Sequence, residues 1–478
     1  MEPTCAEVTF GSRTARVVLA AAVLGSSMAL LDSTVVNVAL HQIGKELDAS
    51  LGELQWVSNG YLLSLASLTL VGGSLGDRFG RRRIFMLGVL GFAVMSAACG
   101  LAPTAPVLIA GRILQGVAAA MLVPGSLAMI QGTFAESDRG RAIGAWSGLG
   151  GIATAIGPFV GGWLVQSVSW RWVFLINLPV AVLTLAAARA VPETRDPSVV
   201  RGFDVLGALL GALGLGGVTY ALIEWRTTPA AALPAAMVGV IAAVAFLVHE
   251  RRSRNPMLPP SLFTSRQFSA ANAMTLLTYA ALGGVLFFLV LQLQTVSGFG
   301  ALRAGLATLP ITVIMLLLAG RGGALAGRIG PRLPMTVGPL LCAVGALLLS
   351  RVGADLNYWT DVAIPLTVFG LGLAALVAPL TAAVLAAAPA EHAGVASGVN
   401  NAVARAGSLI AVAALPLVVG LSGEDYALAS AFSAGYHAAM LWCAVLLVGG
   451  GVLSFALIRN PGRLSAVPAP PPGRSAHP

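Results

Sequence analysis

Long apolar runs recur along almost the whole chain, and they limit the fold more than any other feature. A helix that crosses a bilayer needs about 20 mostly apolar residues, and this measure predicts fourteen spanning helices. Only 10% of the residues are charged and mean hydropathy is +0.86, whereas roughly a quarter of the residues of a soluble domain are charged. The chain is therefore predicted to be an all-α polytopic membrane protein. The predicted spans are residues 16–41, 54–75, 84–101, 106–130, 142–166, 172–190, 204–224, 231–249, 269–294, 304–326, 334–351, 362–387, 396–420 and 437–458.

The charged residues predict the orientation in the membrane. The chain has 28 Lys and Arg against 19 Asp and Glu, and the cations lie in short clusters between apolar runs. If both termini are cytoplasmic, most of these cations fall on the cytoplasmic side, as the positive-inside rule requires of a protein of the cell (plasma or inner) membrane. The expected partner of the clusters is anionic membrane lipid rather than nucleic acid. The polar residues 1–15 and the long apolar run after them do not resemble a cleaved signal peptide.

Several kinds of chemistry are disfavoured, because the residues they need are missing or dispersed along the sequence. Lys45 is the one lysine and is followed by Glu46, so there is no Gly-Lys-Ser/Thr loop to bind nucleotide phosphates, and no ATPase domain is expected in this chain. The four cysteines and five histidines are dispersed, which argues against a metal site or a disulfide framework. The connections between helices are too short for a catalytic domain. We therefore expect no enzyme activity, no cofactor and no metal; a polytopic membrane enzyme is the disfavoured alternative.

An internal repeat divides the chain into two halves. The segment 73–82 matches the segment 323–332 after a shift of about 250 residues, with glycine, leucine and arginine at equivalent positions. Two six-helix bundles with two inserted helices are expected, an arrangement typical of secondary transporters. The predicted division is a cytoplasmic tail over 1–15, an N-terminal bundle over 16–191, a linker with helices seven and eight over 192–268, a C-terminal bundle over 269–459 and a disordered cytoplasmic tail over 460–478.

Five short motifs resemble those of the major facilitator superfamily, and specifically of its fourteen-helix drug:proton antiporter branch. They occur in the expected order and cover nearly the whole chain. One departure is His41, where that branch usually has proline. The motifs are Leu31–Leu40 in the first helix, Gly73–Arg83 between helices two and three, Leu108–Gly116 in helix four, Gly157–Gly162 in helix five and Trp170–Pro179 after it.

The resemblance implies the major facilitator fold and a function. The chain is expected to be a proton-coupled secondary transporter that exports lipophilic drugs or related amphiphilic compounds by alternating access. Its partners are then a small drug-like molecule and protons. A dedicated exporter of a single metabolite, antibiotic or lipid on the same fold is the alternative. Because extra membrane carboxylates are lacking, monovalent lipophilic cations and neutral or zwitterionic compounds are expected to fit better than divalent cations.

Asp32 and Arg112 are the candidate proton-coupling residues. A charge deep in a bilayer costs at least about 2.5 kcal/mol, so such a residue usually faces a cavity or a partner. Both residues fall in the outer half of helices that are neighbours in the family fold, so a direct or water-bridged pair is expected. Protonation of Asp32 would then release Arg112. The alternative is that both have purely structural partners, such as Ser33 or Thr34 for Asp32 and Gln115 for Arg112.

The loop between helices two and three is the candidate gate. The resemblance implies that it latches the two halves in one state, with Asp77 at a helix N-terminus and paired with an arginine. Positive-inside anchoring alone would explain the arginines but not the aspartate. The second-half counterpart has Gly327 in place of the aspartate. The gate residues are Gly73, Asp77, Arg78, Gly80, Arg81 and Arg82.

Helix five carries the motif associated with exporters. Its glycines allow close helix approach, and its proline removes one backbone donor. Packing alone explains this composition, and restriction of leak at the boundary of the halves is a compatible second role. The motif residues are Gly157, Pro158, Gly161 and Gly162.

Polar and aromatic residues within the predicted helices form the candidate substrate pocket. A drug site is a largely apolar pocket with a few hydrogen-bonding groups. For any one of these residues, packing is a better explanation than contact with a substrate. Arg405 is the exception, because a guanidinium at that depth needs a cavity or a partner. The candidates are Asn37, Trp56, Asn59, Tyr61, Gln115, Trp146, Tyr279, Phe287, Gln292, Gln294, Asn401 and Arg405.

Overall fold

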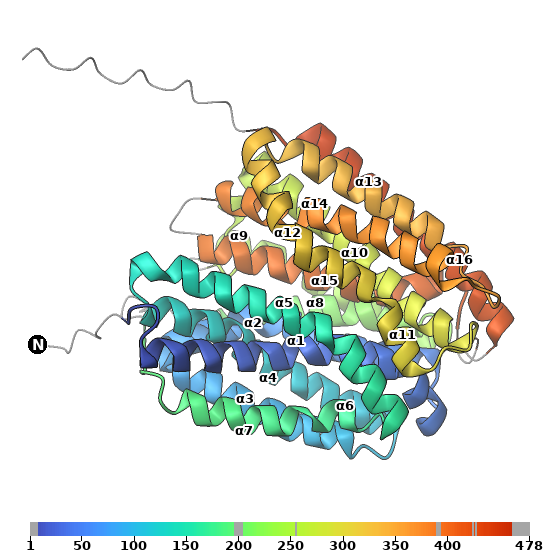
Figure 1. Cartoon of the computed structure of the whole chain (residues 1–478), viewed down its shortest axis with the longest axis horizontal. Coiled ribbons are helices and arrows are strands. Elements are labelled where there is room, and N and C mark those ends of the chain that lie inside the picture. The colour runs from blue at the N-terminus through green and yellow to red at the C-terminus, as the bar shows by residue number, and fades with distance from the viewer. Residues whose placement is uncertain are drawn as a thin grey trace, which may run out of the picture.

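The protein is a bundle of long, roughly parallel and antiparallel helices (Figure 1). The computed structural model describes residues 8–195, 204–253, 256–388, 393–422, 425 and 428–460. Of the segments predicted as tails, residues 1–7 and 461–478 lie outside the described residues, whereas α1 already begins at Arg13, within the predicted N-terminal tail. The helices are α1 (Arg13–Leu47), α2 (Leu51–Phe79), α3 (Arg81–Gly100), α4 (Ala105–Thr133), α5 (Glu136–Ser167), α6 (Trp172–Leu175), α7 (Asn177–Ala188), α8 (Val205–Glu224), α9 (Pro229–Arg252), η1 (Pro260–Thr264), α10 (Arg266–Thr295), α11 (Ala301–Ala307), α12 (Leu309–Ile329), α13 (Arg332–Leu349), η2 (Tyr358–Ala363), α14 (Ile364–Ala386), α15 (Ala393–Val418) and α16 (Ala429–Leu457).

In the described part of the chain, 12 helices are long and apolar enough to cross a membrane. This confirms a multi-pass, all-helical membrane protein. The predicted number was larger by two. The 29-residue α2 is not among the 12, because polar residues such as Gln55 and Asn59 interrupt its apolar sequence, and the apolar segment Trp172–Ala188 is shorter than the rest.

Two predicted spans are broken in the structure. The span predicted over 172–190 divides at Ile176 into α6 and α7, and the span predicted over 304–326 divides at Thr308 into α11 and α12. Pro179 and Pro310 lie just after the two breaks. A proline ring collides with the carbonyl four residues before it, so a continuous helix is disfavoured at both places.

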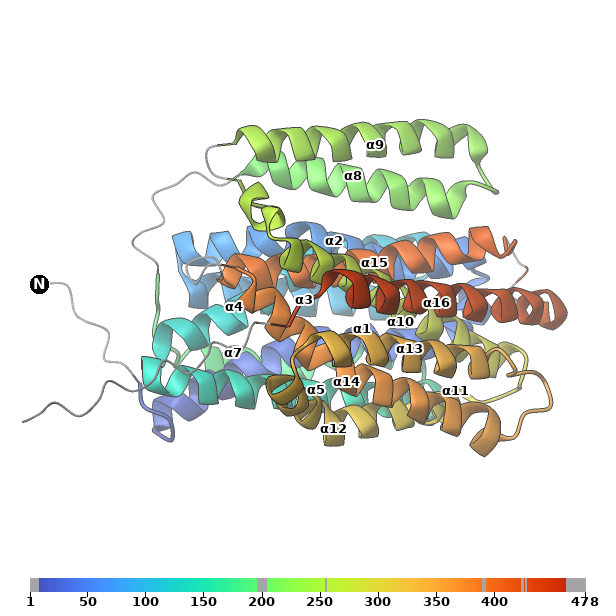
Figure 2. The ribbon, with the colours of Figure 1, turned by 90° about the horizontal axis from the view of Figure 1, so that it is seen from above.

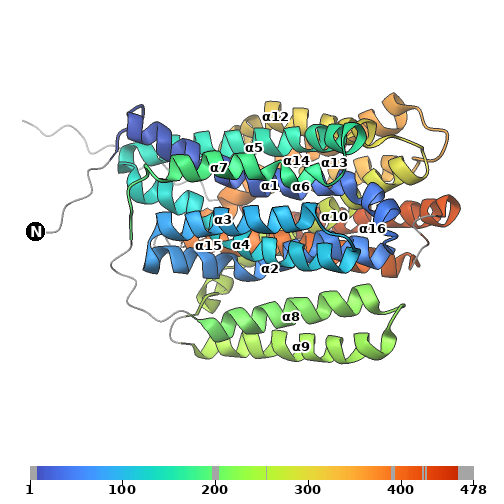
Figure 3. The ribbon, with the colours of Figure 1, turned by 90° about the horizontal axis from the view of Figure 1, so that it is seen from below.

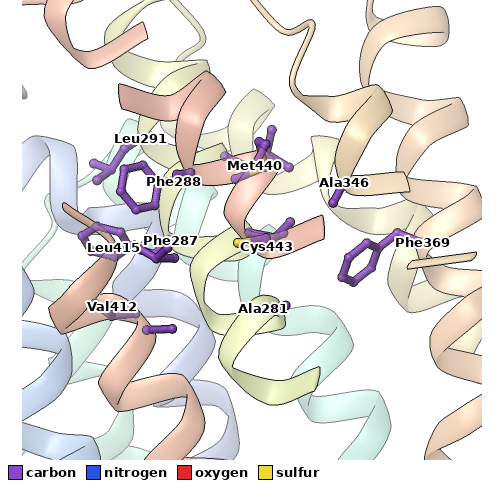
Figure 4. Close-up of a cluster of buried hydrophobic side chains, with 14 of the residues drawn as sticks. Ala281, Phe287, Phe288, Leu291, Ala346, Phe369, Val412, Leu415, Met440 and Cys443 are labelled. Carbon is purple, nitrogen blue, oxygen red and sulfur yellow. The ribbon is translucent and has the colours of Figure 1, made fainter. Parts of the chain in front are cut away.

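The same helix pairs pack in the two halves of the chain. In the N-terminal half, α1 packs against α5 and α7, and α4 packs against α2 and α3. In the C-terminal half, α10 packs against α15 and α16, and α14 packs against α12 and α13. Figure 4 shows part of the larger apolar core, where Phe287 and Phe288 of α10 lie near Met440 and Cys443 of α16.

The repeated sequence segments form the same turn. Gly80 ends α2 with φ +114°, and Gly330 ends α12 with φ +87°, a region of backbone conformation that favours glycine. After each glycine, the arginine two residues on donates its backbone N–H to the segment that follows the half's last helix. Arg82 donates to Glu193 Oε1 at 3.0 Å, and Arg332 donates to Asn460 Oδ1 at 3.1 Å. The repeat found in the sequence thus has a structural counterpart.

The helices α8 and α9 form a hairpin that lies beside the bundle, next to α2 and α15 (Figures 2 and 3). Gly217 and Gly239 allow the two helices to meet at main-chain distance, since a Cβ on either would lie 2.9 Å or closer to backbone atoms of the other helix. Most of α9 is exposed, including Met237 and Ile241. Its apolar outer surface is the kind that faces lipid in a membrane.

The two halves are joined at one end of the bundle, which we call the closed end. It contains the end of α1, the start of α2 and the ends of α5 and α10. Within the described residues, all hydrogen bonds between the halves lie there. Gln55 of α2 donates to Val412 O of α15 at 2.7 Å, and Gln294 of α10 donates to Val38 O of α1 at 3.1 Å. The arginine-rich turn at Gly80 lies at the opposite end.

Candidate functional site

A buried ion pair joins α1 and α4. Arg112 Nη1 donates to Asp32 Oδ2 at 2.5 Å, and the two side chains are 1% and 0% exposed. The structure therefore brings the two candidate coupling residues into direct contact. Taking two charges out of water is unfavourable unless hydrogen bonds satisfy their remaining donors and acceptors, so their other partners matter.

Amides and one hydroxyl complete the surroundings of Asp32. Gln115 Nε2 donates to Asp32 Oδ1 at 3.0 Å and to Ser96 Oγ at 3.0 Å. Asn177 Nδ2 donates to Asp32 Oδ1 at 3.3 Å and to the same hydroxyl at 2.9 Å. The carboxylate is thus held by three side chains from α4 and α7. Sequence reasoning did not single out Ser96 or Asn177; Asn177 lies inside the motif Trp170–Pro179, whereas a lone serine in an apolar run gives no signal.

Arg112 has partners besides the carboxylate. Its Nε donates to Val57 O at 3.0 Å, and its Nη1 also donates to Gln115 Oε1 at 2.6 Å. The guanidinium carbon lies 4.3 Å from the ring centre of Tyr61 and 5.7 Å from that of Phe174, distances at which aromatic faces attract a cation. The cation would therefore keep stabilising contacts if Asp32 lost its charge.

A cavity of about 180 Å³, the central cavity, adjoins this pair at the boundary of the two halves. Arg112 is one of its lining residues, while Asp32 lies behind it. Candidates Asn37, Tyr61, Tyr279 and Phe287 also line the cavity. The helices that contribute are α1, α2, α4, α10 and α15, so both halves form its wall.

A second cavity of about 290 Å³, the α14–α15 cavity, continues from the first. The two share Leu62, Tyr279 and Ser408 as lining residues. Candidates Asn401 and Arg405 line the second cavity. Its wall includes the end of α14 and the start of α15, which lie away from the closed end.

Six of the predicted pocket residues line neither cavity. One of them, Gln115, instead binds Arg112 and Asp32. Gln292 and Gln294 face carbonyl groups instead, donating to Val352 O at 3.0 Å and Val38 O at 3.1 Å. Trp56 packs against Tyr220 of α8, with 6.0 Å between ring centres. The remaining two are taken up by packing. Trp146 is half-buried against the apolar core of the N-terminal half, and Asn59 is fully buried with no hydrogen-bond partner among the described residues.

The candidate gating loop makes its contacts within the N-terminal half. Asp77 accepts from Arg81 Nε at 2.8 Å, and Glu193 lies 3.7 Å from Arg82 Nε. Arg78 lies over the ring of the neighbouring Phe79 at 5.3 Å. A Cβ on Gly73 would lie 3.7 Å from Pro124 in α4. Asp77 is in the last turn of α2 rather than at a helix N-terminus, because the helix continues to Phe79. An arginine partner is present, but no ion pair joins the loop to the other half among the described residues.

The exporter-motif glycines allow α5 to pack closely on both sides. A Cβ on Gly157 or Gly161 would collide with Thr34 or Val35 of α1. A Cβ on Gly162 would lie 2.6 Å from Leu302 Cα of α11, in the other half. Pro158 contributes its carbonyl to the same contact, directly against Gly305. These four residues therefore lie at the closed end, between the two halves.

Comparison with known families agrees with this architecture. The model described as Major Facilitator Superfamily matches residues 22–204 and 198–412. The chain belongs to the major facilitator superfamily. The resemblance seen in the five motifs is thereby confirmed, and the superfamily is one of transporters.

Curated relatives of this superfamily member are resistance and export proteins. It is 36% identical over 406 residues to the tetracenomycin C resistance and export protein of Streptomyces glaucescens, covering 84% of this chain and 75% of that protein. It is 35% identical to the methylenomycin A resistance protein of Streptomyces coelicolor, covering 97% of each. It is 34% identical to the multidrug resistance protein Stp of Mycobacterium tuberculosis, covering 85% of this chain and 76% of that protein. These similarities place the superfamily member in the drug-exporting branch.

Solved structures share its fold. A D-xylose-proton symporter matches with a TM-score of 0.67 at 16% identity, over 93% of this chain and 98% of that one. A bacterial homologue of the human lysosomal transporter Spinster, in an inward-facing conformation, matches with a TM-score of 0.66 at 18% identity, over 94% and 98%. At such identities the similarity establishes the fold alone.

Proposed function

We propose that this protein is a proton-coupled exporter of lipophilic or amphiphilic small molecules, working by alternating access in the cell (plasma or inner) membrane. The observation that carries the proposal is the buried Asp32–Arg112 pair beside a cavity between two repeated halves. The named functions of the curated relatives, resistance and export, support the direction of transport.

The pair explains how a proton and a cargo affect each other. Protonation of Asp32 removes the charge that attracts Arg112, and Val57 O, Gln115 and the ring of Tyr61 remain to stabilise the guanidinium. Because Arg112 lines the central cavity, its movement alters the surface on which cargo binds. A ligand shifts an equilibrium only through different affinities for the two states, and this link supplies such a difference.

We further propose fourteen spanning segments, with α2 and the α6–α7 pair added to the 12. The division into a tail (1–15), two bundles (16–191 and 269–459), an inserted linker (192–268) and a second tail (460–478) follows from this count, with both termini cytoplasmic. The arginine-rich end is then cytoplasmic, and the closed end faces outward. In this proposal the conformation is inward-facing, because the two halves are joined at the end that faces outward. On rocking to the outward-facing state, the Asp77 loop is proposed to contact the other half.

A dedicated exporter of one compound is the second candidate. Two of the relatives are named for a single antibiotic, tetracenomycin C or methylenomycin A. Transport assays with a panel of compounds separate the two candidates, because a dedicated exporter transports one scaffold and a multidrug exporter transports several.

The test of proton coupling is Asp32→Asn in proteoliposomes with an imposed pH gradient. The variant keeps the shape of the side chain but carries no charge, so gradient-driven efflux should vanish while exchange of labelled substrate survives. The matched control is Asp355→Asn, an exposed aspartate of the C-terminal half, which should transport normally. Full gradient-driven efflux in Asp32→Asn would place the coupling at another residue and refute the mechanism.

A further inference from the structure

Among the described residues, Arg405 lacks the hydrogen-bond or ion-pair partners that the other buried or half-buried arginines have. It is half-buried in α15 and lines the α14–α15 cavity. Among the described residues it makes no hydrogen bond and no ion pair within 4.0 Å. By contrast, buried Arg112 binds a carboxylate, and half-buried Arg82 donates to Val191 O through Nη1 at 3.0 Å. An arginine held for structural reasons would show similar bonds to carbonyl groups.

The two connected cavities therefore have a net positive charge. Of the described residues that line them, Arg112 and Arg405 are the charged ones, and none is a carboxylate. Asp32 neutralises Arg112, so the remaining positive charge is that of Arg405. The titratable groups that interact electrostatically with Arg405 are the phenols of Tyr61 and Tyr279, which are neutral at physiological pH. A cation in such a place is unfavourable until an anion arrives.

The surroundings of Arg405 have hydrogen-bonding groups on one side and apolar groups on the other. Asn401 and Ser408 lie on the same face of α15 as Arg405, at helical spacing of four and three residues, and all three line the cavity. Further along, Ser58 lines the central cavity, and its buried Oγ has no hydrogen-bond partner among the described residues. The walls between are apolar, and they include Phe287 of the core cluster. A ligand that fits has an apolar body and one polar, negatively charged end.

Resting on the export function proposed above, we propose that the cargo carries an acidic group, a carboxylate or an ionised phenol, which binds the Arg405 guanidinium. The apolar part of the same molecule occupies the central cavity. An ionised acid gives Arg405 the charge-assisted hydrogen bonds that the protein does not provide. A lipophilic cation, by contrast, is repelled by the net positive charge of the site. This narrows the broader set of compounds that the sequence favoured.

The test uses three probes that share one fluorescent body: dansylglycine (carboxylate), dansylglycinamide (neutral) and a dansyl-ethyl-trimethylammonium ion. Binding to the full-length protein in lipid nanodiscs is followed by the rise in dansyl fluorescence. We expect the carboxylate to bind about tenfold or more tightly than the amide. Arg405→Gln should reduce this ratio to near one without weakening the amide, and Arg405→Lys should retain part of it.

Arg321→Gln is the matched control, because Arg321 is exposed on α12 and donates only to the carbonyl of its own helix, Leu317 O. It should keep the wild-type ratio. An unchanged ratio in Arg405→Gln, or tighter binding of the ammonium probe than of the carboxylate, would overturn the assignment. Export of the amide or ammonium probe under a pH gradient, without preference for the carboxylate, would overturn this inference alone. Binding with the expected preference for the carboxylate, but no gradient-driven export of any probe, would leave the assignment of Arg405 in place and overturn the multidrug form of the proposed function.

Discussion

Gly162 offers a direct way to disturb the closed end of the transporter. It lies where α5 meets α11 of the other half. A Cβ there would lie 2.6 Å from Leu302 Cα and 2.7 Å from Ala301 O, whereas ordinary contact begins at 3.4 Å. Backbone atoms cannot rotate away as the end of a side chain can. Gly162→Ala must therefore separate the two halves at this end by about 0.8 Å or distort the helices.

The size of the shift between the two transport states follows from the free-energy cost of overpacking this contact. Forcing an extra carbon into a close-packed contact destabilises it by about 1–3 kcal/mol. Because the contact exists only while this end is closed, the penalty falls on one of the two transport states. The ratio of closed to open molecules at this end should change by roughly 5- to 150-fold.

Pulsed electron paramagnetic resonance measures this shift. Spin labels at Val168 and Arg351, two exposed positions beyond the ends of α5 and α13, report the distance between the halves at the closed end. Gly162→Ala should increase the population with longer distances. The control is Gly148→Ala in the same helix, where a Cβ would meet nothing within 4 Å. Identical distance distributions in the two variants would refute the reasoning.

Three further predictions concern stability and orientation. Gly330→Ala should lower the free energy of unfolding by about 1 kcal/mol or more, because φ is +87° at this position. Gly327→Ala is the control and should leave it unchanged, because a Cβ there would meet nothing within 4 Å. Equal thermal unfolding midpoints for the two variants would contradict this prediction. Gln115→Leu should destabilise by about 1–3 kcal/mol, since a buried carboxylate and guanidinium each lose a partner, and an unchanged midpoint would argue against it. A cysteine at exposed Arg252 should react with an impermeant maleimide only from the cytoplasm, and one at exposed Trp359 only from outside; labelling of both from one side would refute the fourteen-segment topology. Arg254, a sharper position for the same test, lies outside the described residues.

The features that could be predicted from the sequence are those that differ in kind from the apolar residues around them. Asp32 and Arg112 are charges within hydrophobic runs, so their need for a partner is visible without a structure, and they are in contact. The repeated glycine turn was visible because Gly80 and Gly330 require a backbone conformation that few residues adopt. Long apolar runs likewise predicted the helices, although not the breaks, since a proline within a helix is tolerated at Pro124 and Pro158.

Which polar residues face the cavities could not be predicted from the sequence, because this depends on how each helix is rotated about its own axis. Gln292 and Gln294 look like pocket residues because they are polar and intramembrane, but they face carbonyl groups of neighbouring chain segments. Trp56 faces the inserted hairpin. That Arg405 has no hydrogen-bond or ion-pair partner in the part of the chain the structure describes is also invisible in the sequence, because it depends on the helices that surround the α14–α15 cavity.

The closed end has a consequence for how such a protein diversifies. Gln55 and Gln294 bind across the boundary to main-chain carbonyls, at Val412 and Val38. Every residue type supplies a carbonyl, so mutation of the accepting residue leaves the bond available. Val412 shows what this permits, since its carbonyl holds the two halves together while its side chain lines the central cavity. Selection for a new cargo can therefore replace that side chain in descendants without rebuilding the contact that closes the transporter.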